Sequence, residues 1–265
     1  MMKAREHYLQ GNLTEALSEL SSELKQNPAD TSLRIFLFEL LVFQGEYNRA
    51  LKQLDIISHY NPLTQLSLYS MNIAAELARL DVFNGRSKPE FFSAPPDFID
   101  LYIKSIGEFK DNNLQKVQEL LNQAQELCTY NVWNFVETET SVDFIIDSND
   151  FIGNVLEVFV GDRYFWIPLE NILSLKVHQP ALLRDLIWIT ADIECDERYS
   201  NVPDRVFLPV LYCNSSTSTD EQVRLGRITV WDEVVDKIMI PKGRKTYLTN
   251  ENDLSIFDLN IQRLP

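Results

Sequence analysis

Carboxylates are densest in the C-terminal half of the chain, where four of them follow one another closely: Asp192, Glu194, Asp196 and Glu197. Such a group could hold a divalent cation or supply a carboxylate pair for general acid–base chemistry. The segment lacks the ordered ligands, glycine and terminal glutamate of a calcium-binding loop. We therefore interpret it as a solvated loop, and keep a hydrolase or transferase site in this half as the alternative hypothesis.

The other residue types that carry catalysis are scattered along the chain. The histidines lack metal-ligand spacing, such as two histidines one helical turn apart: His7, His59 and His178. The glycines form neither a phosphate-binding loop nor a dinucleotide fingerprint, and no serine lies in a Gly-x-Ser-x-Gly turn. The cysteines are too far apart to suggest a zinc pair or a secreted disulfide framework: Cys128, Cys195 and Cys213. The sequence thus predicts no enzyme, no metal site and no cofactor.

The acidic balance of the chain restricts its partners. The formal net charge is −15: residues 1–130 hold 12 Lys and Arg against 17 Asp and Glu, and residues 131–265 hold 12 against 22. A site for nucleic acid or an anionic membrane needs a clustered basic face. The short basic run Lys242-Gly243-Arg244-Lys245 is interpreted as a solvated turn. Since no run approaches the roughly 20 apolar residues of a membrane-spanning helix and the N-terminus lacks a signal core, we expect a cytoplasmic protein.

The elements that would position a binding site repeat in the N-terminal half. Residues 11–17 align with residues 45–51 at an offset of 34, and at the same offset Leu20 falls on Leu54. This is the period of the tetratricopeptide repeat, a helix–turn–helix unit. Gly11 and its counterpart Gly45 would end the first helix of each unit, because glycine adopts a left-handed conformation at little cost.

The second helix of each unit has its own signals. Ala16 and Ala50 would lie where the paired helices approach most closely, and Pro28 and Pro62 would end the helix because proline lacks an N–H donor. The helical period continues beyond the second unit and, after an interruption at residues 87–96, yields a further pair of helices. About six helices are therefore expected before Tyr130.

A stack of helical hairpins leaves one concave surface, built from the first helix of each pair. Such a surface binds a peptide or a helix. The first-helix positions that would face the groove are Arg5, Tyr8, Leu9, Ile35, Glu39 and Phe43. Tyr8 and Phe43 are the predicted anchors, since aromatic side chains supply much contact area, and Arg5 and Glu39 are predicted rim charges. In the alternative interpretation, the apolar members Leu9, Ile35 and Phe43 pack against a neighbouring helix.

After Tyr130 the helical period gives way to the alternation of strands. Strands are predicted at residues 132–136, 142–146, 155–160, 163–167, 172–177, 187–193, 206–212, 227–231, 246–248 and 255–261. A short helix is predicted at residues 180–186. The sequence therefore predicts an α+β protein: tetratricopeptide-like helical hairpins in residues 1–130, then a β-rich, strongly bent antiparallel sheet or small barrel in residues 131–265.

Several blocks of this sequence resemble the ImpE/TagJ family. In the β-rich half they are Gly153–Glu157, Gly161–Pro168, Leu183–Trp188, Leu208–Tyr212 and Arg224–Arg227, and upstream they are Leu33–Leu41 and Gly45–Tyr47. The resemblance implies a cytosolic accessory protein of a bacterial type VI secretion system, also called an SciE-type virulence protein, with no catalytic motif. It further implies a partner, the small subunit of the contractile sheath, which some members bind through that subunit's N-terminal helix.

Overall fold

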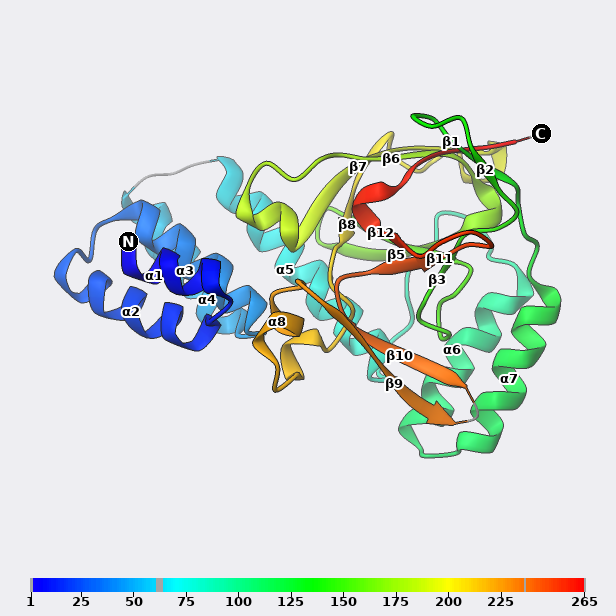
Figure 1. Ribbon diagram of the computed structural model, residues 1–265, viewed down its shortest axis with the longest axis horizontal. Helices are drawn as coiled ribbons and strands as arrows, with labels where there is room; N and C mark the ends of the chain where they lie inside the picture. The colour runs from blue at the N-terminus through cyan, green and yellow to red at the C-terminus, as the bar shows by residue number, and fades with distance from the viewer. Residues whose placement is uncertain (1, 61–63, 236, 265) are drawn as a thin grey trace.

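The computed structural model describes residues 2–60, 64–235 and 237–264. Within them, seven helices precede residue 130: α1 (Met2–Gln10), α2 (Leu13–Gln26), α3 (Thr31–Phe43), α4 (Tyr47–Tyr60), α5 (Thr64–Phe83), α6 (Asp97–Lys110) and α7 (Leu114–Leu127). A single turn, α8 (Glu221–Arg224), lies in the C-terminal half. The α1–α4 bundle lies at one end of the elongated molecule and the sheet at the other, with α5 between them (Figure 1).

The two helical hairpins form as the repeat predicts. Gly11 and Gly45 take positive φ angles of 89° and 76° after the first helix of each pair. Their N–H groups donate to the carbonyls of Tyr8 and Val42, each at 2.9 Å, and so satisfy the free carbonyls at the helix end. Ala16 of α2 is fully buried, as is the matching alanine of α4. The predicted close helix contacts are therefore confirmed.

The described residues before Tyr130 form seven helices, one more than the expected six, and the predicted helix before Gly11 is among them. The predicted end of α2 is confirmed, since this helix stops at Gln26, two residues before Pro28. Asp30 then caps α3 by accepting the N–H of Leu33 at 3.0 Å. The predicted helix end at Pro62 lies outside the described residues.

Thirteen strands are present in the described chain: β1 (Trp133–Phe135), β2 (Ser141–Val142), β3 (Ile146–Asp147), β4 (Val155–Val160), β5 (Arg163–Pro168), β6 (Ile172–Val177), β7 (Trp188–Cys195), β8 (Arg205–Pro209), β9 (Thr229–Val235), β10 (Ile238–Gly243), β11 (Thr246–Leu248), β12 (Leu254–Ser255) and β13 (Asn260–Arg263). Strand β10 was not predicted, because Pro241 and the basic run that follows interrupt its pattern. The predicted strand at residues 142–146 is instead split between β2 and β3.

Most strands join one antiparallel sheet in the order β2-β1-β13-β6-β7-β8-β4-β5. Strands β9 and β10 form a separate ribbon, and β12, β11 and β3 form a small third sheet. Helix α5 packs on β4 and β5, while the α6–α7 hairpin lies beside the β9–β10 ribbon (Figure 1). This arrangement is the predicted α+β fold, with helical hairpins followed by antiparallel sheet.

Both faces of β4 and β5, at one edge of the main sheet, are buried. On β4, Val155 and Phe159 join the core formed with the helices, whereas Leu156 and Val158 join a second core on the opposite face. Strand β5 alternates in the same way, which is why both strands are almost continuously apolar. The helical half and the β-rich half therefore share one core, which keeps the helical bundle in contact with the sheet.

Candidate functional site

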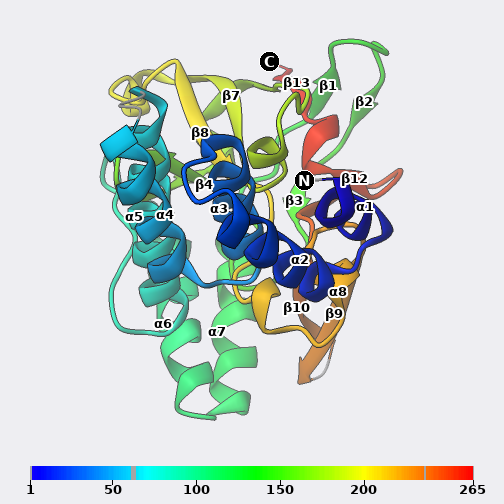
Figure 2. The ribbon, with the colours of Figure 1, turned by 90° about the vertical axis from the view of Figure 1, so that its left-hand side faces the viewer.

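A groove lies between α1, α3 and the 3-10 helix Leu183–Leu186 of the β-rich half. Figure 2 looks onto the end of the molecule that carries α1, α2, α3 and α4. The groove encloses about 270 Å³ and is lined by Arg5, Tyr8, Ser32, Ile35, Phe36, Glu39 and Leu183. The four residues of α3 follow i, i+3, i+4 and i+7 spacing, which places them on one helix face. Four of the six predicted groove residues are thus brought together: Arg5, Tyr8, Ile35 and Glu39.

Tyr8 is held in place by both halves of the chain. Its ring meets Phe36 edge to face, with the centroids 6.0 Å apart. The Arg227 guanidinium lies 5.4 Å from the centroid of the same ring, and Arg227 Nη1 donates to the Leu9 carbonyl at 3.0 Å. Leu9 itself is 65% exposed and does not line the groove. The C-terminal end of α1 is therefore held in position by Arg227, a residue that follows α8.

Glu39 is the most deeply placed charged residue of the groove, with 8% of its surface exposed. Burial raises the pKa of its carboxyl group to about 7. The backbone N–H of Arg184 and the charges of Arg184 and Arg5 act in the opposite direction without offsetting the burial, and Asp185 raises the pKa further. Near neutral pH this carboxyl group is therefore divided between its protonated and ionised forms.

Phe43 is not a groove residue, and the expectation that it is an exposed anchor is wrong. It is 1% exposed and belongs to the core shared by the two halves. Residues of the β-rich half, Ile187 and Tyr212 among them, lie around this end of α3. With α2 and α4 they bury every residue of α3 from Leu37 to Phe43, and the groove face of the helix ends at Glu39.

The contribution of the β-rich half to the groove was missed at the sequence level. Leu183 belongs to the segment predicted as a short helix, and the structure confirms a helical turn there. Its neighbour Leu182 is 52% exposed beside the groove wall. Two adjacent leucines in a short segment between strands were the available signal, but the helical half gave no indication that they would approach α3.

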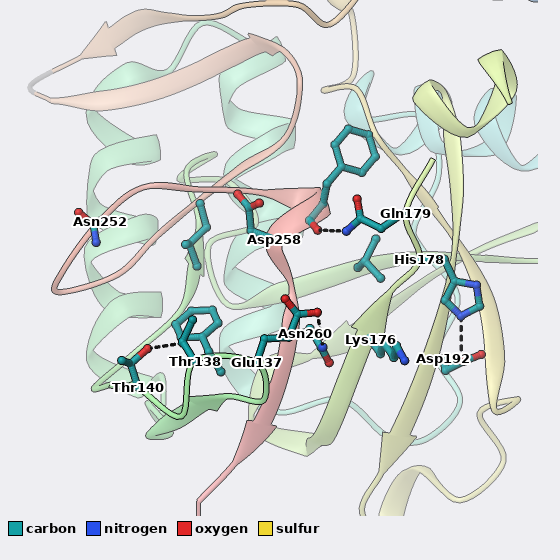
Figure 3. Close-up of a pocket in the computed structure, with 14 residues that line it drawn as sticks. Glu137, Thr138, Thr140, Lys176, His178, Gln179, Asp192, Asn252, Asp258 and Asn260 are labelled. Carbon is teal, nitrogen blue, oxygen red and sulfur yellow. Dashed lines mark hydrogen bonds and ion pairs between the residues drawn. The ribbon is translucent and has the colours of Figure 1, made fainter. Parts of the chain in front are cut away.

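A second and larger cavity, of about 690 Å³, lies in the β-rich half between β6, β7, β13 and the loops near residues 138 and 252. Figure 3 shows that His178 points toward Asp192 in this cavity. His178 Nε2 lies 2.7 Å from Asp192 Oδ2, and its Nδ1 lies 3.3 Å from Thr190 Oγ1. Arg205 donates to the other Asp192 oxygen at 2.7 Å. His178 thus bridges the hydroxyl of Thr190 and the carboxylate of Asp192, which Arg205 also contacts.

The acidic cluster is the predicted solvated loop only in its second part, where Glu197 is exposed in the 3-10 turn after β7; the first part belongs to the strand. Asp192 and Glu194 lie in β7, where they alternate with the buried residues Ala191 and Ile193. Hydrogen bonds from Arg205 and then His178 lower the pKa of Asp192 to about 2, which suits a charge pair across the sheet. Within residues 2–60, 64–235 and 237–264, no group of three or more His, Cys, Asp and Glu side chains could hold a metal ion.

A buried ionic cluster fastens α5 to the sheet. Arg79 of α5 donates to Glu157 of β4, with Nε 2.7 Å from Oε1, and to Glu76 at 2.9 Å. Lys245 lies 2.8 Å from Glu157 Oε2 and also pairs with Asp147 of β3. The charged side chains are almost completely enclosed. Burial opposes the ionisation of Glu157, yet Arg79 and Lys245 outweigh it and lower the pKa to about 2.

The basic run at residues 242–245 is therefore not a solvated turn. Lys242 and Gly243 end strand β10, and Lys245 is 1% exposed. The prediction was wrong because the carboxylates that compensate Lys245 lie far away in the sequence, Asp147 being 98 positions distant. None of the described helices is both long enough and apolar enough to cross a membrane.

The comparisons with known proteins cover both halves of the chain. Residues 7–69 match a tetratricopeptide repeat family, and residues 139–262 match the family described as ImpE protein. A protein of Pseudomonas aeruginosa, the type VI secretion system accessory component TagJ, is 31% identical over 97% of this chain and 89% of its own length. The chain belongs to the ImpE/TagJ family. Neither the family nor this relative is named as an enzyme.

In this ImpE/TagJ chain, both walls of the groove lie within the residue ranges that match the two family models. The tetratricopeptide region includes Tyr8, Ile35 and Glu39, and the ImpE region includes Leu183 and the buried Lys245. The same fold occurs in the crystal structure of protein VPA1032 from Vibrio parahaemolyticus, with a TM-score of 0.88, 24% identity, and coverage of 99% of this chain and 98% of that chain. The 34-residue repeat and the α+β fold are thus confirmed.

Proposed function

We propose that this chain is a non-enzymatic, cytoplasmic accessory adaptor of a bacterial type VI secretion system. Its partner in this proposal is the small subunit of the contractile sheath, bound through the N-terminal helix of that subunit. Membership of the ImpE/TagJ family supports the secretion role. The observation that carries the binding role is the preformed groove between α1 and α3.

The groove has the composition that helix recognition requires. Ile35, Phe36 and Leu183 make its wall apolar, whereas Arg5 and Glu39 add charge. An amphipathic helix places apolar anchors at i, i+3, i+4 and i+7 into such a groove and keeps its charges at the edge. Tyr8 is the aromatic residue best placed to contact it, because the ring is half-buried and already ordered by Phe36 and Arg227.

Titration of the sheath subunit's N-terminal peptide into the full chain tests this function. Truncation of a central aromatic contact costs about 2 kcal/mol or more, so Tyr8→Ala should weaken binding about 30-fold. The matched control is Tyr130→Ala, since Tyr130 is 43% exposed and contacts Phe144 in the β-rich half. Circular dichroism and thermal unfolding would establish that both variants are folded.

The expected pattern is full affinity in Tyr130→Ala and a large loss in Tyr8→Ala. If wild type and a folded Tyr8→Ala variant bound the peptide with equal affinity, the groove would not be its binding site. An equal loss in both tyrosine variants would locate the peptide elsewhere on the surface.

A further inference from the structure

We infer that the groove selects a helix that places a Lys or Arg side chain against Glu39, beside an apolar side chain that enters the cavity. This inference rests on the proposed function, because it specifies the chemistry of the partner at the same groove. It identifies Glu39 as the residue that distinguishes one amphipathic helix from another.

Glu39 is enclosed without a charge partner of its own. It lines the cavity at 8% exposure, and among the described residues no Lys or Arg forms an ion pair with it. A carboxylate removed from water is unfavourable unless a cation or hydrogen-bond donors compensate it. The Arg184 backbone N–H is one such donor. A side-chain cation from the partner would supply the missing compensation.

The groups that face Glu39 come from three elements, and none of them forms an ion pair with its carboxylate in the free chain. Arg5 and Tyr8 belong to α1, Arg184 and Asp185 to the 3-10 helix, and Tyr69 to α5. The Arg184 guanidinium lies 5.1 Å from the Tyr69 ring centroid and its Nε 3.4 Å from Asp185 Oδ1, while Nε and Nη1 have no hydrogen-bond partner within the described chain. Arg5 is exposed at the rim.

The charge of the whole chain favours the same kind of partner. The formal net charge is −15, and the helical half alone has more carboxylates than cations. Such a field accelerates the encounter with a basic segment and disfavours an acidic one. On a helix, residues three or four positions apart share one face. One apolar anchor and one cation at that spacing can therefore reach the cavity wall and Glu39 together.

The test uses the N-terminal peptide of the sheath small subunit and a series in which each Lys or Arg is replaced in turn by Met. Each peptide is titrated into wild type, Glu39→Gln and Glu15→Gln at pH 6 and pH 8. Glutamine keeps the shape of residue 39 and an oxygen that can accept the Arg184 N–H, so this variant should fold. Glu15 is exposed on α2 and controls for the loss of one negative charge.

One Met replacement should weaken binding to wild type and to Glu15→Gln about 10-fold, and should have no effect in Glu39→Gln. Because the partner cation binds the ionised carboxylate, wild-type affinity for the unaltered peptide should increase from pH 6 to pH 8, as Glu39 loses its proton. In Glu39→Gln this increase should be absent.

The two proposals fail in different ways. If the unaltered peptide does not bind wild type at either pH, the proposed function itself is contradicted. If it binds, but every Met replacement has the same effect in wild type and Glu39→Gln, the function stands and the selection by Glu39 is refuted. Affinity that falls toward pH 8 in wild type alone would also refute it, since that result requires protonated Glu39 in the complex.

Discussion

Replacement of Lys245 tests the buried ionic cluster most severely. Lys245→Met keeps most of the side-chain volume but removes the cation that pairs with Asp147 and Glu157. Glu157 retains Arg79 at 2.7 Å, whereas Asp147 loses its only ion-pair partner among the described residues. Removal of one member of a buried pair costs about 3–5 kcal/mol. We expect a loss of that size in the free energy of unfolding.

The chain provides a matched control three positions earlier. Lys242 pairs with Asp232 at 2.9 Å, but 60% of the Asp232 side chain is exposed. An ion pair in water contributes about 0–1 kcal/mol, so Lys242→Met should have little effect. Urea unfolding followed by tryptophan fluorescence measures both variants. Equal and small losses would refute the account of a buried cluster that fastens α5 to the sheet.

The loss in the free energy of unfolding of Lys245→Met should also depend on pH. Burial already raises the pKa of Asp147 despite the nearby lysine, and loss of the cation raises it further. A carboxyl group whose pKa is raised on folding stabilises the folded state at low pH and loses this contribution as pH rises through its folded pKa. The loss in the free energy of unfolding relative to wild type should therefore be larger at pH 8 than at pH 5, by up to about 1.4 kcal/mol per pH unit.

Two further stability predictions follow from the backbone. Gly243 has a φ of 104°, and a Cβ there would lie 2.1 Å from the Ile228 carbonyl oxygen, so Gly243→Ala should cost about 2 kcal/mol or more. Gly107→Ala is the matched control in α6: its Cβ would meet no atom within 4 Å, and thermal unfolding should show a gain of about 0.5–1 kcal/mol. Asp30→Ala removes the cap that accepts the Leu33 N–H and should cost about 1 kcal/mol in the same assay.

Local features of the fold could be predicted because their signals are local. The repeat of Gly11 and Gly45 at one offset indicates two helical hairpins, and the structure has both glycines in the left-handed region. The turn between the predicted strands at residues 155–160 and 163–167 is made at Gly161, whose φ is 63°. Alternating residues such as Tyr164 and Trp166 fall on one face of β5, as strand geometry requires.

Features that depend on contacts between the halves could not be predicted in this way. The burial of Lys245 depends on Asp147 and Glu157, which other strands supply. The burial of Phe43 depends on the β-rich half covering the end of α3. One signal for Phe43 was available, because α3 is apolar on nearly all sides after Leu37, and such a helix is buried. Leu183 of the groove has no comparable signal, since only the folded chain brings it to α3.

We propose that the α1–α3 groove holds the N-terminal helix of the sheath small subunit. It is tested most directly by a photo-reactive amino acid placed at Ile35, in cells that carry the intact secretion cluster, with the same substitution at Tyr130 as the control. We predict a cross-link from position 35 to the N-terminal segment of the sheath small subunit, and none from position 130. A sheath cross-link from position 130 and none from position 35 would show that the helix binds outside the groove.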